Sequence, residues 1–92
     1  MSLGLTVHSS FDEVAAAIIR ETKRRGYQRH ESVACLSTGI QESNLRPDAV
    51  NPRGPWVGIY QQDASYPGRY DPNQNILEFL NRLDAKRRSP GA

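Results

Sequence analysis

The sequence contains a single cysteine among 92 residues, which excludes an intramolecular disulfide. Small secreted domains usually rely on disulfides, so this fold must draw its stability from packing. Cys35 has small apolar neighbours and no basic residue placed to activate a thiolate, which favours a buried hydrophobic role over a nucleophile. The two histidines, His8 and His30, have no spaced cysteine or histidine partners, so we expect no metal site.

Long apolar runs are also missing, and with them any sign of a transmembrane segment. The N-terminus lacks a basic segment followed by an apolar one, so no signal peptide is recognisable and the chain could be cut from a longer protein. A length of 92 residues, 37% of them hydrophobic, suits one domain with a modest core. Residues 1–8 show no hydrophobic period and are expected to form a loose tail.

Charge is mild overall, with a net value of +2, but the cations gather in two segments. One segment runs from Lys23 to Arg29 and the other from Lys86 to Arg88. Both lie where helices are expected to end, and helix C-termini favour cations. No aromatic residues alternate with these cations, so we expect no nucleic-acid partner. Binding of these cations to anionic cell-wall polymers remains an alternative.

The hydrophobic period predicts helices over residues 11–25, 31–41 and 72–87. Ser10 and Glu13 have the spacing of a capping box at the start of the first helix, and Gly26 is expected to end it in a left-handed conformation. Asp71 and Pro72 suit the N-cap and first position of the last helix.

The middle helix contains an uncharged run from Val33 to Ile40, which leaves little surface for solvent. We therefore predict a mainly α domain, with three to four helices around this central buried helix and a loop or short hairpin near residues 56–60 that forms a groove. Leu36 and Ile40 are expected to fill the core. Gly39 costs about 1 kcal/mol of helix propensity against alanine, which is best explained by the close approach of another element.

Glu42 is the first candidate for chemistry. It follows the predicted buried helix on the face of Thr38 and Gly39, so it can lie in a cleft while Ile40 packs on the other side. Burial and the partial negative charge of a helix C-terminus both favour the protonated form of a carboxyl group. A carboxylic acid that stays protonated near neutral pH can give its proton to the leaving oxygen of a glycosidic bond.

The segment that follows combines a Glu-Ser pair with spaced proline, glycine and glutamine residues, namely Glu42, Ser43, Pro47, Ala49, Val50, Gly54, Gly58, Ile59 and Gln61. Together these residues resemble the lysozyme-like family of soluble lytic transglycosylases and goose-type lysozymes. A looser match, Asp71 to Ile76, resembles the Asp-Pro-x-x-Asn-Ile start of a later helix in that family. The resemblance covers about residues 31–85.

The resemblance implies a lysozyme-like α+β fold and cleavage of peptidoglycan glycan strands between N-acetylmuramic acid and N-acetylglucosamine, without a cofactor. It assigns the role of general acid to Glu42 and a place in the sugar groove to Gln61. Residues 38–43 and 61–63 look like wall-active domains of actinobacteria and their phages, including lysins and tail proteins. This implies a location in the cell wall or on a phage particle.

The sequence departs from the family at Asn51, where serine is frequent, and at Pro55 to Val57, which lengthens the loop by one residue. The family's Ala-Tyr-Asn-Ala-Gly segment is also missing, so either one wall of the groove is absent or Tyr60, Tyr66 or Tyr70 supplies it. Apolar surface that the family's later helices cover is then expected to be exposed near Cys35, Ile40 and residues 79–83. Such exposure predicts self-association and a Glu42 that is more solvated than in a complete groove.

Asp63 stands where goose-type lysozymes have an aspartate after their Gly-Leu-Met-Gln segment. It is the candidate for positioning water opposite Glu42, with a turn residue as the alternative. Aromatic rings suit sugar faces, although Trp56 and Tyr60 could equally fill the core. The predicted substrate-binding residues are Ser43, Asn51, Trp56, Gly58, Tyr60, Gln61 and Tyr66.

Two functions from other classes compete with the enzyme. One is a non-catalytic peptidoglycan-binding or phage tail structural module that retains the groove. The other is a helix-turn-helix DNA-binding domain, which the apolar run over residues 33–40 argues against because a recognition helix needs exposed polar side chains.

Overall fold

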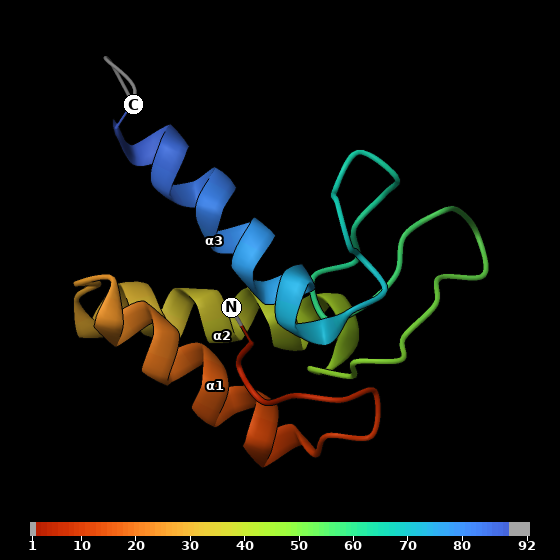
Figure 1. Cartoon of the computed structure of the whole chain (residues 1–92), viewed down its shortest axis with the longest axis horizontal. Helices are drawn as coiled ribbons and strands as arrows, with labels where there is room; N and C mark the ends of the chain where they lie inside the picture. The colour runs from red at the N-terminus through yellow and green to blue at the C-terminus, as the bar shows by residue number, and fades with distance from the viewer. Residues whose placement is uncertain (1, 89–92) are drawn as a thin grey trace.

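Three helices lie within residues 2–88, the part of the chain that the computed structural model describes. α1 spans Phe11–Arg24, α2 spans Arg29–Ser43 and α3 spans Pro72–Arg88. α1 and α2 run in opposite directions, α3 crosses above them, and the long segment 44–71 gathers at the far end of α2 (Figure 1). The prediction of a mainly α domain is confirmed. Among the described residues no helix is both long and apolar enough to cross a membrane.

The capping signals start α1 and α3 where the sequence predicts them, whereas α2 extends two residues beyond its predicted bounds at each end. The hydroxyl of Ser10 accepts a hydrogen bond from the amide of Glu13 at 3.2 Å, and the Glu13 carboxylate accepts one from the amide of Ser10 at 2.8 Å. The carboxylate of Asp71 caps α3 by accepting from the Asn73 amide at 2.9 Å. Gly26, at φ +82°, follows the end of α1 in the left-handed conformation. These three local predictions are confirmed.

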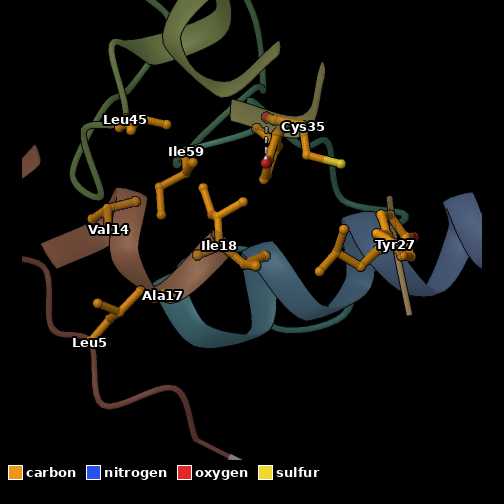
Figure 2. Close-up of a cluster of buried hydrophobic side chains, with 11 residues drawn as sticks. Leu5, Val14, Ala17, Ile18, Tyr27, Cys35, Leu45 and Ile59 are labelled. Carbon is orange, nitrogen blue, oxygen red and sulfur yellow. Dashed lines mark hydrogen bonds between the residues drawn. The ribbon is translucent and has the colours of Figure 1, made fainter. Parts of the chain in front are cut away.

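The core forms where α1 meets α3 and the loop residues that follow α2. Its fully buried side chains come from all three sources: Val14, Ala17, Ile18, Leu45, Ile59, Ile76 and Leu80. In Figure 2 Ile18 lies among the labelled side chains, with Ile59 and Leu45 on the side facing the loop. Cys35 is 3% exposed in this cluster, and burial raises the pKa of its thiol, so the prediction of a buried cysteine is confirmed.

The prediction of a central, buried second helix is wrong. Only Ser32, Cys35 and Gly39 of α2 are buried, whereas Val33 and Ile40 are 51% and 42% exposed. The buried residues repeat at the helical period, so a single stripe of α2 faces α1 and the loop. The side of α2 opposite this stripe carries no buried residue. The exposure of Ile40 agrees with the expected apolar surface, but the expectation is wrong for Cys35 and Leu80, which are 3% and 0% exposed, because both pack into the core. Self-association stays a prediction.

The prediction of a loose N-terminal tail is also wrong for residues 3–5. The side-chain oxygen of Asn73 accepts hydrogen bonds from the amides of Leu3 and Leu5 at 3.0 and 2.9 Å, and its nitrogen donates to the Leu5 carbonyl at 3.0 Å. Leu5 is 8% exposed and joins the core. A buried asparagine amide bonds to backbone much as a neighbouring strand would, so it can fix a segment that has no hydrophobic period.

Candidate functional site

The predicted acid lies at the end of α2, and the residue after it joins that end to the loop. Glu42 is exposed in the last turn. Ser43 donates its hydroxyl hydrogen to the carbonyl of Ile59 at 2.7 Å, and its oxygen accepts from the amide of Arg46 at 3.2 Å. The helix end that carries Glu42 is therefore fixed against residues 58–61, although Glu42 itself is not enclosed as the expected cleft would require.

The chain leaves α2 through two left-handed residues. Asn44 has φ 56° and Leu45 has φ 59°, and their amides donate to the carbonyls of Ile40 and Gly39 at 2.8 and 3.3 Å. This reversal folds Leu45 back onto the helix, as in other left-handed helix ends. A Cβ atom on Gly39 would lie 2.6 Å from Cδ2 of Leu45, which confirms that Gly39 is needed for a close approach.

Residues 49–62 form an irregular loop with Val57 at its centre. Val57 makes isolated bridges to Val50 on one side and Gln62 on the other, and the Gly58 amide donates to the Ala49 carbonyl at 2.8 Å. Of the two expectations, a loop or a short hairpin, the structure shows a loop, with a tight turn from Val57 to Gln62. These two bridges are the whole of the strand-like pairing found in residues 2–88.

A single asparagine of α3 holds this turn in place. Asn75 is fully buried, and its side-chain oxygen accepts from the Tyr60 amide at 2.9 Å. Its side-chain nitrogen donates to the carbonyls of Val57 and Arg69 at 3.2 and 2.9 Å, and its own carbonyl accepts from the Gln62 side chain at 2.7 Å. Asn75 thus connects the turn, the following loop and α3. Sequence reasoning noted it only within the start of a helix.

Gln61 supports the turn from within. Its backbone has φ 48°, and its side-chain nitrogen donates to the carbonyls of Gly58 and Ala49 at 2.9 and 3.4 Å. These bonds stabilise the shape of the turn beside Ser43. Gly58, at φ +82°, contributes backbone only.

Tyr60 is placed differently from its predicted sugar contact. It is 5% exposed, its hydroxyl donates to the Cys35 carbonyl at 2.8 Å, and its ring stacks on Phe79 with centroids 3.7 Å apart. Because both the ring and the hydroxyl are engaged inside the protein, Tyr60 has the core role that the sequence left as its alternative.

Trp56 is open to solvent at 41% exposure, as is Tyr70 at 66% near the start of α3. The Trp56 ring covers Gly54, where a Cβ atom would lie 2.2 Å from the six-membered ring. The side chain of Asn51 shapes the same tip by accepting from the Arg53 amide at 2.8 Å. This tip offers an apolar ring face of the kind that carbohydrate binding uses.

Asp63 and Tyr66 belong to the loop that leads to α3. One oxygen of Asp63 accepts from the hydroxyl and the amide of Ser65, at 2.7 and 2.9 Å, and these bonds lower the pKa of the Asp63 carboxyl. The guanidinium of Arg82 lies 3.5 Å from the Tyr66 ring centroid and donates to the Ser65 carbonyl at 2.7 Å. Asp63 therefore has the geometry of a turn residue, and Tyr66 is covered on one face.

The structure thus brings Ser43 together with Gly58, Ile59 and Gln61, places Glu42 beside them, and moves Tyr60 into the core. Within residues 2–88, no cluster of three histidine, cysteine, aspartate or glutamate side chains could hold a metal ion. No protein-family model, curated protein or solved structure matches the chain.

Proposed function

We propose that the chain is a lysozyme-like domain that cleaves the glycan strand of peptidoglycan, with Glu42 as the general acid. The observation that carries the proposal is the 2.7 Å hydrogen bond from Ser43 to the carbonyl of Ile59. It holds the residue next to Glu42 against the turn formed by residues 58–61. Catalysis by a positioned acid needs such support, because an acid that moves with a free helix end loses the benefit of orientation.

The chemistry assigned to Glu42 has two proton transfers. Its carboxyl group donates a proton to the glycosidic oxygen as that bond breaks, and the resulting carboxylate then accepts a proton from the attacking hydroxyl. Asp63 is engaged by Ser65, so a single acid is favoured over a pair of carboxylates. A single acid suits lytic transglycosylation, in which a hydroxyl of the substrate replaces water, while a muramidase would use water.

The test is mass spectrometry of peptidoglycan digested by the wild type and by Glu42→Gln. The amide keeps the size of the side chain but cannot donate the proton, so we expect cleavage to fall by about two orders of magnitude or more. Glu78→Gln, the same change on a partly buried residue of α3, is the matched control and should cleave at the wild-type rate. Equal cleavage by Glu42→Gln and wild type would refute the role of Glu42. A product lighter by one water identifies transglycosylation.

A wall-binding module without turnover is the second candidate. The exposure of Glu42 favours it, because an acid outside a cleft is not held in one orientation by surrounding side chains. In this case both Glu42→Gln and the wild type would sediment with purified peptidoglycan, and neither would release fragments.

A further inference from the structure

Two basic segments that are distant in the sequence meet at one end of the molecule. Arg25 binds Asp84 with a nitrogen to oxygen distance of 2.8 Å, and Arg87 binds Glu31 at 2.7 Å. In Figure 1 the last turns of α3 lie over the corner between α1 and α2, opposite the loops of residues 44–71. We call this end the cationic pole, and its basic residues are Lys23, Arg24, Arg25, Arg29, Lys86, Arg87 and Arg88.

The pole carries more positive charge than its surroundings neutralise. Its seven cations face three carboxylates, those of Glu21, Glu31 and Asp84, which leaves four positive charges. The whole chain carries only +2, so the remainder of the protein is negative by two charges. The C-terminal ends of α1 and α3 together offset only about one positive charge, at roughly 0.5 for each helix end. Helix capping alone therefore does not account for the pole.

Internal ion pairs hold several of these arginines in position. The Glu21 carboxylate is 3% exposed and binds both Arg24 and Arg25 at 2.7 Å. Arg87 lies over the ring of Tyr27, 4.6 Å from its centroid. Arg25, Arg87, Arg88 and Asp84 line an open hollow of about 450 Å³. A ligand with several negative charges would meet guanidinium groups that are already ordered, which lowers the entropy cost of binding.

We propose that the cationic pole binds a flexible phosphodiester polymer without bases, such as a polyol-phosphate chain. Five of the seven cations are arginines, whose planar guanidinium groups match the paired oxygens of a phosphate.

The absence of stacking surfaces argues against nucleic acid. Single strands bind through exposed aromatic rings, whereas Tyr27, the aromatic residue at the pole, is 7% exposed and covered by Arg87. Duplex DNA is read by a helix face or ribbon in the major groove, whereas the pole consists of helix ends.

The pole is separate from the candidate catalytic site. Glu31 lies in the first turn of α2 and Glu42 in the last, so the two positions are roughly 16 Å apart at 1.5 Å per residue. The inference uses no property of Glu42 and stands or falls independently of the proposed function.

The experiment measures binding of a synthetic, fluorescently labelled poly(glycerol phosphate) by anisotropy over a series of NaCl concentrations. We expect saturable binding that weakens with salt, with a log-log slope of about 2 to 3, because each phosphate contact on a flexible strand releases about 0.7 counterions. The pole variant Lys23→Gln/Lys86→Gln/Arg88→Gln removes three exposed cations and should bind about tenfold more weakly.

The matched control is Arg46→Gln/Arg53→Gln/Arg69→Gln, which lowers the net charge equally in the loops of residues 44–71, at the end opposite the pole, and should change affinity by less than about threefold. Lys23→Arg/Lys86→Arg/Arg88→Lys keeps the charge and should bind like the wild type. An equal loss in both triple glutamine variants, or no saturable binding by the wild type, would overturn the proposal. It would also be overturned if thymidine oligonucleotides, duplex DNA or polyglutamate of matched charge bound as tightly.

Discussion

A Cβ atom added to Gly58 would lie 2.3 Å from the side-chain nitrogen of Asn75. That nitrogen donates to the carbonyls of Val57 and Arg69, so Gly58→Ala would displace the amide that holds the turn. Gly58 also has φ +82°, where alanine is strained by about 1 to 2 kcal/mol. We expect Gly58→Ala to lower the free energy of unfolding by about 3 kcal/mol or more, because hydrogen bonds of about 1 kcal/mol each are lost in addition to the strain. Urea denaturation measures this.

Gly26 provides the matched control for that prediction. It has the same φ of +82°, but nothing lies within 4 Å of the position of its Cβ atom. Gly26→Ala should therefore cost only the strain of about 1 to 2 kcal/mol. Equal losses at the two glycines would show that Asn75 adjusts without cost.

Gly39→Ala tests whether a better helix former stabilises α2. Alanine gains about 1 kcal/mol of helix propensity. Its Cβ atom would meet Leu45 at 2.6 Å, and Leu45 is 1% exposed with no room to move. We expect a net loss of about 1 to 3 kcal/mol from overpacking, measured by thermal unfolding. Ser37→Ala, at an exposed position of the same helix, should instead raise stability by about 0.5 kcal/mol.

Tyr60 and Trp56 should respond in opposite ways to truncation. Tyr60→Ala removes a buried ring stacked on Phe79 and should cost about 3 to 5 kcal/mol of stability. Trp56→Ala removes an exposed ring and should leave stability within about 1 kcal/mol, while weakening the sedimentation of the protein with peptidoglycan. If Tyr60→Phe, which keeps the ring, weakened wall binding without loss of stability, the core role of Tyr60 would be wrong.

Acid should weaken the junction of the three helices. Hydrogen bonds from Arg24, opposed by burial, lower the pKa of Glu21 from 4.5 to about 2. A lowered carboxyl pKa stabilises the fold above the unfolded value and the stabilisation is lost as pH falls toward the folded value, here between about pH 5 and 2. Glu21 contributes up to about 3 kcal/mol over this range, because each pKa unit corresponds to about 1.4 kcal/mol. Urea denaturation between pH 2 and 6 should show the loss, and Glu21→Gln should flatten it.

Helix boundaries were largely predictable because they depend on a few adjacent residues. Ser10, Glu13, Gly26 and Asp71 act on backbone groups within three positions of themselves, so their spacing alone carries the information. Gly39 was predictable for a related reason, since a glycine in a helix interior needs an explanation from packing.

The uncharged run over residues 33–40 did not predict how much of α2 is buried. Val33 and Ile40 are apolar, but which face of a helix is covered depends on the direction in which distant elements cross it. The sequence did not predict that Asn73 and Asn75 bind distant backbone groups, for a similar reason. Their partners, such as Leu5 and Tyr60, lie 68 and 15 residues away, and an asparagine in a helix sequence looks the same whether it is solvated or buried. The polar start of α3, Asn73-Gln74-Asn75, gives no signal that separates the two buried asparagines from the partly exposed glutamine.

The way Asn75 joins α3 to the turn also bears on how the protein opens. Its side-chain oxygen accepts a hydrogen bond from the Tyr60 amide, and its backbone carbonyl accepts one from the Gln62 side chain. The turn beside Ser43 therefore cannot separate from α3 without breaking both bonds, so the two should exchange their amide hydrogens as one cooperative unit. The tip around Asn51 and Trp56 has no comparable tie and should exchange earlier. Under the proposed function, a glycan that binds at this tip orders it without disturbing the helix end that carries Glu42.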